Sequence, residues 1–169
     1  LLFGDGETIA RRIAEDIRQE IGLTVSIGVA NNKIFAKLGS DLRKPDAITV
    51  VAPESYEEKI YPLPVEKIMG VGPATRRKFA KVGIFTIGDL ARMKLDELYL
   101  LLGKNGVRLG IYARGASTSP VRRWGTAEEI KSIGRGMTTC EDMQSEEAVY
   151  SLMKELAQEV GARLRHHYF

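Results

Sequence analysis

The chain has almost no cysteine and no long hydrophobic run. Cys140 is the single cysteine among 169 residues, so no disulfide can form within the chain. Crossing a membrane as a helix requires about 20 consecutive apolar residues, and the sequence contains no such stretch. These absences predict a protein of a reducing, cytoplasmic compartment without a membrane partner.

The sequence also lacks a strong excess of charge of either sign. Lys and Arg total 25 against 22 Asp and Glu, which gives a net charge of +3 and a pI near 9.0. This balance permits a polyanionic partner without requiring one. Basic residues between positions 104 and 135 meet few carboxylates, so this region is a candidate phosphate track. A hydrophobic content of 44% is enough for one large domain or for parts of two or three smaller ones.

The most informative segment is a glycine-containing turn that leads into a basic helix. Gly70 and Gly72 flank Val71, and glycine permits positive φ and leaves the backbone amides open to a ligand. A helix is expected over residues 73–82, with proline at its first position, after a short helical segment over residues 64–68. The free amides and the dipole at such a helix start favour an anion.

The residues around this turn are typical of a helix-hairpin-helix module, which binds duplex DNA through backbone amides without reading base sequence. Thr86 can cap a further helix after the basic one. Two other interpretations stay open: the turn can be a tight connection between packed helices, and the basic residues an ordinary solvated face. A dinucleotide-binding loop fits poorly, because no adequate strand precedes Gly70 and Thr75 stands where a third small residue is needed.

The first 52 residues alternate between helix and strand. Apolar spacing and capping residues predict a helix over residues 6–21, a strand over 23–29, a helix capped by Asn31 or Asn32 that ends at Leu42, and a strand over 48–51. Two strands alone do not make a stable sheet in water. The chain is therefore expected to be a fragment whose missing strands lie upstream.

The remaining sequence predicts helices, a basic tether and a short α+β segment. Residues 95–102 are expected to pack as a helix, and Trp124 to anchor the tether by packing. A strand is expected over residues 132–138, followed by a helix over 146–164 that Ser145 caps. His166 and His167 lack a spaced companion ligand, which argues against a metal role. The expected core of the middle segment consists of Phe79, Val82, Ile84, Ile87 and Leu90.

Three separated stretches occur in one order along the chain. The first is residues 24–41 (TVSIGVANNKIFAKLGSD) followed by Lys44-Pro45-Asp46. The second is the turn at residues 70–72, here called the glycine hairpin, and the third is the segment Lys-Ser-Ile-Gly-Arg at 131–135. Together they resemble the Y-family of translesion DNA polymerases, in its bacterial DinB or polymerase IV (UmuC-like) branch. The resemblance implies an α/β plus α fold. Its parts are a helix-strand-helix-strand partial palm over 1–52, an all-helical thumb with the helix-hairpin-helix over 53–119, a linker over 120–130, and the first strand and helix of an α+β little finger over 131–169.

The resemblance implies error-prone, template-directed DNA synthesis for lesion bypass and repair. The family holds divalent cations, Mg²⁺ in the intact enzyme, on carboxylate motifs that this sequence does not contain. No catalytic residue and no metal ligand are therefore assigned, and the fragment alone is expected to be inactive. Asp41 and Asp46 are the tempting substitutes, but neither has a second carboxylate as companion.

The nucleotide-binding candidate is Lys44, which the resemblance places at the triphosphate of an incoming nucleotide. An ammonium on a flexible stem suits a phosphate cluster. Without the resemblance, Lys44 is an exposed lysine that complements a helix dipole.

The DNA-binding candidates centre on the hairpin, where the resemblance assigns Gly70, Val71, Gly72 and Thr75 to duplex phosphates. Lys33 and Lys37 share one helix face and can contact phosphate or simply solvate that face. The other candidate contacts are Lys78, Arg122, Arg123, Lys131 and Arg135.

The partners implied for the intact enzyme are a primer-template duplex and a deoxynucleoside triphosphate. Recruitment by a sliding clamp through absent regions stays open. Exposed strand edges and apolar faces predict self-association of the fragment, which light scattering measures. The alternative is a non-catalytic helix-hairpin-helix DNA-binding or scaffold protein, and a third possibility is a helical domain that binds only proteins.

Overall fold

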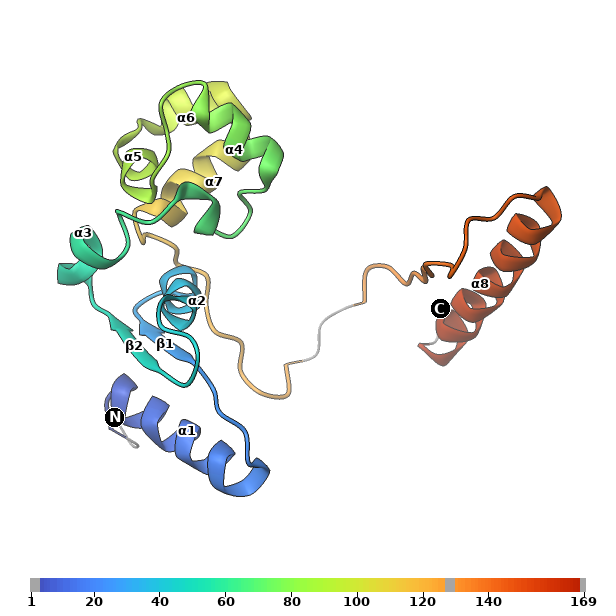
Figure 1. Ribbon diagram of the computed structural model, residues 1–169, viewed down its shortest axis with the longest axis horizontal. Coiled ribbons are helices and arrows are strands. Elements are labelled where there is room, and N and C mark those ends of the chain that lie inside the picture. Colours follow the sequence, from blue (N-terminus) through green and yellow to red (C-terminus); the bar gives the residue numbers. More distant parts are fainter. Residues whose placement is uncertain (1–3, 127–129, 168–169) are drawn as a thin grey trace. The chain divides into compact units, whose positions relative to one another are not determined.

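The computed structural model describes residues 4–126 and 130–167, which fold as two units with a boundary after Val121 (Figure 1). The first unit begins with α1 (Gly6–Ile21), β1 (Ile27–Ala30), α2 (Lys33–Leu42) and β2 (Ile48–Val51). Short helical segments η1 (Pro53–Ser55), α3 (Tyr56–Lys59) and η2 (Val65–Lys67) follow. Its helical part consists of α4 (Pro73–Ala80), α5 (Ile87–Arg92), α6 (Leu95–Leu102) and α7 (Lys104–Ala113).

The two strands form a parallel pair that α2 connects, with Ile27 opposite Ile48 and Ala30 opposite Val51. A Cβ at Gly28 would point into the backbone of α2, whereas the side chain of Val29 lies against α1 at Gly6. Because successive strand residues face opposite sides, α1 and α2 cover opposite faces of the sheet. The expected strand over 23–29 is wrong in its first half, since β2 pairs with β1 only from Ile27 onward.

Local capping groups fix both helices of this α/β part. The carboxylate of Asp5 accepts from the Thr8 amide at 2.8 Å, and Gly22 ends α1 in the left-handed conformation at φ 72°. Of the two candidate caps for α2, Asn32 is the one used, because its side-chain oxygen accepts from the Phe35 amide at 2.9 Å. The helix over 6–21 and the strand over 48–51 are confirmed.

The helical part is built around fully buried side chains from all four helices and the turns between them. A Cβ at Gly106 would lie 2.0 Å from the carbonyl oxygen of Leu98, so α6 and α7 pack at very close range. Val82 was expected in this core but is 48% exposed, because α4 ends at Ala80 and the following turn carries Val82 outward. The residues with essentially no exposure are Phe79, Ile87, Leu90, Leu98, Leu109 and Ala113.

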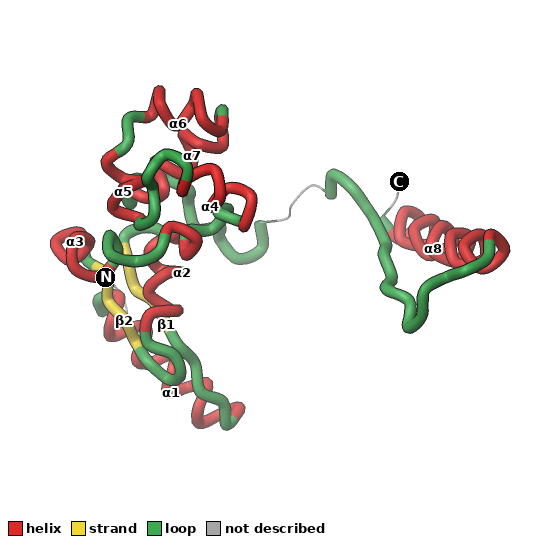
Figure 2. Tube along the Cα trace, turned by 45° about the horizontal axis from the view of Figure 1, so that its top comes forward, coloured by secondary structure: helices red, strands yellow, loops and turns green. Residues whose placement is uncertain are grey.

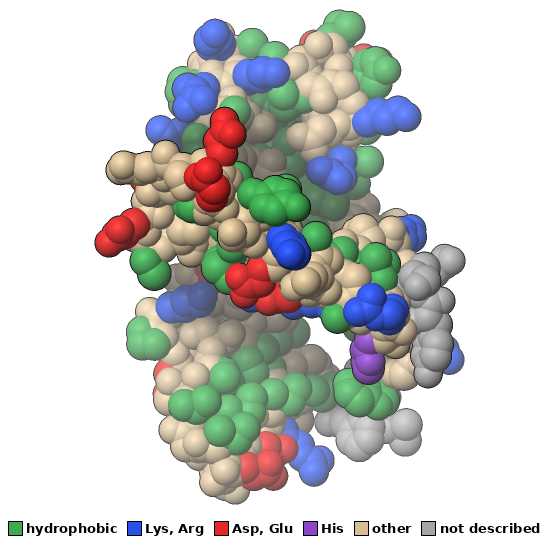
Figure 3. Space-filling view, turned by 90° about the vertical axis from the view of Figure 1, so that its right-hand side faces the viewer, with side chains coloured by type: hydrophobic (Ala, Val, Ile, Leu, Met, Phe, Trp, Pro, Cys, Tyr) green, Lys and Arg blue, Asp and Glu red, His purple; other side chains and the backbone are tan. Residues whose placement is uncertain are grey.

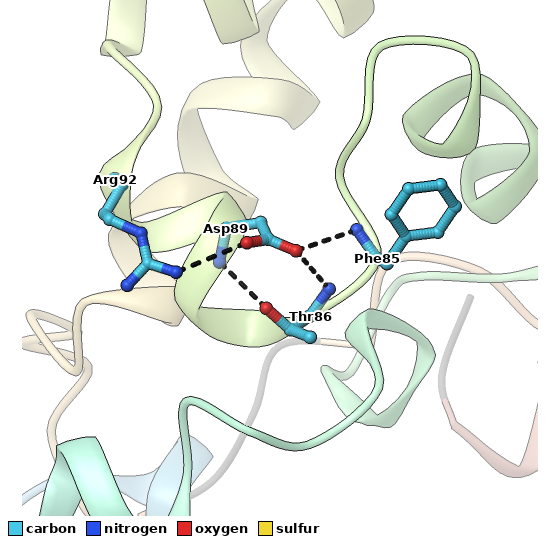
Figure 4. Close-up of polar contacts among 4 residues, drawn as sticks. All are labelled: Phe85, Thr86, Asp89 and Arg92. Carbon is cyan, nitrogen blue, oxygen red and sulfur yellow. Dashed lines mark hydrogen bonds and ion pairs between the residues drawn. The ribbon is translucent and has the colours of Figure 1, made fainter.

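A capping box opens α5, as the sequence position of Thr86 predicts (Figure 4). The Asp89 amide donates to the Thr86 hydroxyl at 3.0 Å, and the Asp89 carboxylate accepts from the amides of Thr86 at 2.9 Å and Phe85 at 3.1 Å. Hydrogen bonds from the Thr86 backbone and hydroxyl lower the pKa of Asp89. Val65 donates to the Phe85 carbonyl at 2.9 Å, so the box also anchors the segment before the glycine turn.

Thr86→Ala is expected to lower the free energy of unfolding by about 1 kcal/mol, the usual value of an N-cap side chain. The Asp89 amide would lose its acceptor and the first turn of α5 would fray. Urea unfolding followed by circular dichroism measures the change. Thr86→Ser is the matched control, because it keeps the hydroxyl, and equal losses in both variants would contradict the capping role.

In the described part of the second unit, α8 (Glu146–His166) is the one helix (Figure 2). Ser145 caps it by accepting from the Ala148 amide. The expected strand over residues 132–138 is not formed. A strand requires a partner for its backbone groups, and the described part of this unit contains no second strand to supply one. Instead, Arg135 pairs with Glu159 of α8 at 2.6 Å, and Arg163 donates to the Gly134 carbonyl at 3.2 Å.

Two further residues of this unit, Trp124 and Cys140, are exposed. The side chain of Trp124 is fully exposed, so the expected packing of the tether by this residue is wrong. Cys140 is a free, exposed thiol. None of the described helices is long and apolar enough to cross a membrane.

Candidate nucleic-acid interface

Two buried apolar side chains anchor the glycine hairpin to the core. Ile68 and Val71 are 1% and 7% exposed, and the Val71 amide closes the turn on the Ile68 carbonyl at 3.0 Å. Gly70 lies between them at φ 97°, a conformation that L-residues rarely adopt. Gly70 and Gly72 are exposed, whereas the amide of buried Val71 is already bonded within the turn, so the backbone that a ligand can reach is that of the two glycines.

The helix after the turn begins with unpaired amides. Gly72 is the N-cap of α4 and provides no side chain to cap it, and Pro73 occupies the first helical position as expected. Gly72 itself has φ −85°, so the expected positive φ occurs at Gly70 and not at Gly72. A Cβ at Gly72 would meet nothing within 4 Å, which means that an anion can reach the first-turn amides of Ala74 and Thr75.

The candidate side chains near the hairpin differ in how exposed and how engaged they are. Thr75 is half-buried, whereas Lys78 is exposed on α4. Arg76 pairs with Glu66 at 3.3 Å across the hairpin. On the face seen in Figure 3, the upper part of the molecule, formed by α4 to α7, carries several separate Lys and Arg side chains.

The candidate Lys44 lies in the turn between α2 and β2, and ion pairs hold this turn on both sides. The Lys44 ammonium contacts one carboxylate oxygen of Asp41 at 2.5 Å, and Lys37 contacts the other at 2.6 Å. Hydrogen bonds from Lys37 and then Lys44 lower the pKa of Asp41 to about 2. Two positions further on, Asp46 accepts from the Arg18 guanidinium at 2.8 and 2.7 Å, which ties the turn to α1.

Lys44 also lines a cavity of about 290 Å³ between α2 and the segment that leads to the hairpin. Lys67 lines the same cavity, over a floor of Leu38, Leu42 and Leu63. Sequence reasoning considered Asp41 only as a metal ligand and missed its pairing with Lys44. The spacing of Lys37, Asp41 and Lys44 at i, i+4 and i+7 was the available signal.

A polar junction connects the α/β part to the end of α7. The Asn32 side chain donates to the Gly115 carbonyl at 3.1 Å, and the Tyr56 hydroxyl contacts the Asn31 side chain at 2.6 Å. Phe35 and Tyr56 meet edge to face at 4.6 Å, and a Cβ at Gly115 would lie 2.7 Å from the Phe35 ring. The two parts of the first unit are therefore packed against each other at Gly115.

The described residues contain no group of three or more His, Cys, Asp and Glu side chains that could hold an ion. Asp41 and Asp46 are both engaged by cationic side chains.

The structure divides the remaining DNA-binding candidates between the two units. Lys33 is exposed at the first position of α2, one turn before Lys37. Arg122, Arg123, Lys131 and Arg135 belong to the second unit, and Arg135 is paired with Glu159.

The chain is similar to known proteins in both sequence and fold. Residues 1–41 match the model of the impB/mucB/samB family. A solved Y-family DNA polymerase chimera of Dbh and Dpo4 aligns with a TM-score of 0.76 and 27% identity over 95% of this chain and 46% of that one. DinB from Sulfolobus solfataricus aligns with a TM-score of 0.60 and 31% identity over 70% of this chain and 35% of that one. The chain belongs to the Y-family of DNA polymerases.

The curated relatives that match this chain are DNA polymerases IV. A DNA polymerase IV of Acetivibrio thermocellus is 48% identical over 99% of this chain and 42% of its own length. DNA polymerase IV of Desulfatibacillum aliphaticivorans is 39% identical over 97% of this chain and 41% of its own length. The chain thus spans about two fifths of the length of these relatives.

Proposed function

We propose that this chain is the segment of an error-prone translesion DNA polymerase that grips the primer-template duplex. The observation that carries the proposal is the Gly70–Gly72 turn, in which buried Ile68 and Val71 fix the exposed glycines Gly70 and Gly72 ahead of an uncapped helix. Backbone amides contact phosphate and read no base edge, so the grip would be independent of sequence. A polymerase that copies any template requires such a grip.

The proposed domain assignment follows the resemblance to the family. Residues 1–52 would be the late part of the palm, 53–119 the thumb, 120–130 the linker and 131–169 the start of the little finger. Lys44 would contact the triphosphate of the incoming nucleotide. Its exposed ammonium lies in a turn that Arg18 and Asp46 hold in place, which supports this role.

The test is binding of this chain to a fluorescent primer-template duplex over a salt series, with a nucleotide-incorporation assay on the same samples. We expect sequence-indifferent binding without incorporation. Affinity should fall with salt by about 0.9 log unit per log unit of salt for each phosphate neutralised by Lys or Arg. Absence of binding at low salt would contradict the proposed grip.

The alternative, a non-catalytic helix-hairpin-helix DNA-binding or scaffold protein, shares the hairpin but has no use for Lys44. Titration with a deoxynucleoside triphosphate separates the two functions. Weaker triphosphate binding by Lys44→Gln, with unchanged duplex binding, is expected only for the polymerase segment. If Lys44→Gln changes neither kind of binding, the nucleotide role of Lys44 is wrong while the duplex grip still stands.

A further inference from the structure

Both oxygens of the Asp41 carboxylate are engaged by lysines. One oxygen contacts the Lys44 ammonium at 2.5 Å and the other contacts the Lys37 ammonium at 2.6 Å. Lys37 precedes Asp41 by four residues on α2, and Lys44 follows it by three in the next turn. The three side chains carry a net charge of +1, so the cluster still attracts an anion.

The cluster is open to solvent. The side chains of Lys37, Lys44 and Asp41 are 61%, 58% and 39% exposed. Ion pairs at such positions are weak, because water and salt screen them. A phosphate group with several negative charges can therefore replace the carboxylate as the partner of Lys44 without any change in the fold.

The backbone next to Lys44 is restrained separately. Asp46 accepts two hydrogen bonds from Arg18 of α1, which holds the turn independently of Asp41. Loss of the contact between Asp41 and Lys44 would thus free the lysine side chain but leave the turn in place.

We propose that Asp41 is a positioning residue that competes with the incoming triphosphate for Lys44. The carboxylate holds the ammonium at the edge of the cavity until a phosphate displaces it. Lys37 then remains on Asp41, so that the carboxylate keeps a partner beside the bound triphosphate. This inference rests on the proposed role of Lys44 and adds the residue that sets how readily Lys44 is released.

The test measures binding of dATP and of inorganic tripolyphosphate, without divalent metal, to the whole chain and its variants. Asp41→Asn removes the competitor and is expected to tighten both affinities by about two- to fivefold, in keeping with a weak exposed pair. Asp16→Asn is the matched control: Asp16 is also exposed on a helix, and its partner Arg12 lies 3.9 Å away. It removes the same charge and should change the affinities less.

The decisive comparison is a double-mutant cycle with Lys44→Gln. If Asp41 acts through Lys44, Asp41→Asn in the Lys44→Gln background has no larger effect than Asp16→Asn. Resonances of the lysine ammonium groups give a second readout: in the parent chain triphosphate should shift both Lys44 and Lys37, and in Asp41→Asn only Lys44. Circular dichroism checks that every variant is folded.

Four results would overturn the inference, and they are distinguishable. Equal effects of Asp41→Asn with and without Lys44 would reject Asp41 as the competitor while leaving the role of Lys44 intact. Weaker binding by Asp41→Asn would give the carboxylate the opposite role. Undetectable triphosphate binding by the parent chain, or binding that Lys44→Gln leaves unchanged, would reject Lys44 as a phosphate ligand and the inference with it.

Discussion

Gly72→Ala is expected to weaken duplex binding at least tenfold while the stability of the chain stays nearly unchanged. Gly72 has φ −85°, and a Cβ there meets nothing within 4 Å, so alanine fits the folded chain without strain. The added methyl group would instead occupy the space through which a phosphate approaches the amides of α4. Hydrogen bonds to charged groups contribute about 1.5–3 kcal/mol, and about 1.4 kcal/mol corresponds to tenfold in affinity.

Fluorescence anisotropy with a primer-template duplex measures this affinity, and a thermal melt measures stability. Gly70→Ala should lower both, because φ 97° is strained for alanine by about 1–2 kcal/mol. Gly83→Ala is the matched control for that strain: Gly83 has φ 79°, a Cβ there also meets nothing within 4 Å, and it follows the opposite end of α4. We expect Gly83→Ala to destabilise the chain without weakening duplex binding.

Unchanged duplex affinity in the double variant Gly70→Ala/Gly72→Ala would identify the hairpin as a tight connection between helices and nothing more. The basic residues of α4 would then form an ordinary solvated helix face. Duplex binding would then have to be sought on other surfaces of the chain.

Gly28→Ala is expected to destabilise the chain by about 3 kcal/mol or more, as overpacking at a backbone contact does. A Cβ on Gly28 would lie 1.9 Å from the carbonyl oxygen of Ala36 and 2.5 Å from the amide nitrogen of Ser40. Both atoms belong to the backbone of α2 and cannot move aside as a side chain would. The methyl group would therefore push α2, with Lys37 and Asp41, away from β1.

Urea unfolding followed by far-ultraviolet circular dichroism tests this effect. Gly136→Ala is the control, since a Cβ there meets nothing within 4 Å and its φ is not positive. We expect its free energy of unfolding to stay within about 0.5 kcal/mol of the parent value. A Gly28→Ala variant as stable as the parent would contradict the close packing of α2 on β1.

Local signals were enough to predict most helices and the turn at Gly70. Asn32, Thr86 and Ser145 cap the helices they were expected to cap, because a capping side chain bonds an amide only two or three residues away. Gly70 was recognisable as a turn residue for the same reason, since positive φ is a property of one residue and its neighbours. The candidate grip of the hairpin thus depends mainly on short-range sequence.

What the sequence by itself determined is therefore most of the helices, three of their caps and the turn at Gly70. Tertiary structure decided where β1 begins, that residues 132–138 form no strand, and that Trp124 is exposed. It also decided that Arg18 of α1 holds Asp46 and that Asn32 meets Gly115. These outcomes share one physical reason: strand pairing, burial and long-range ion pairs need a partner from a distant segment, and the sequence around a residue does not contain that partner.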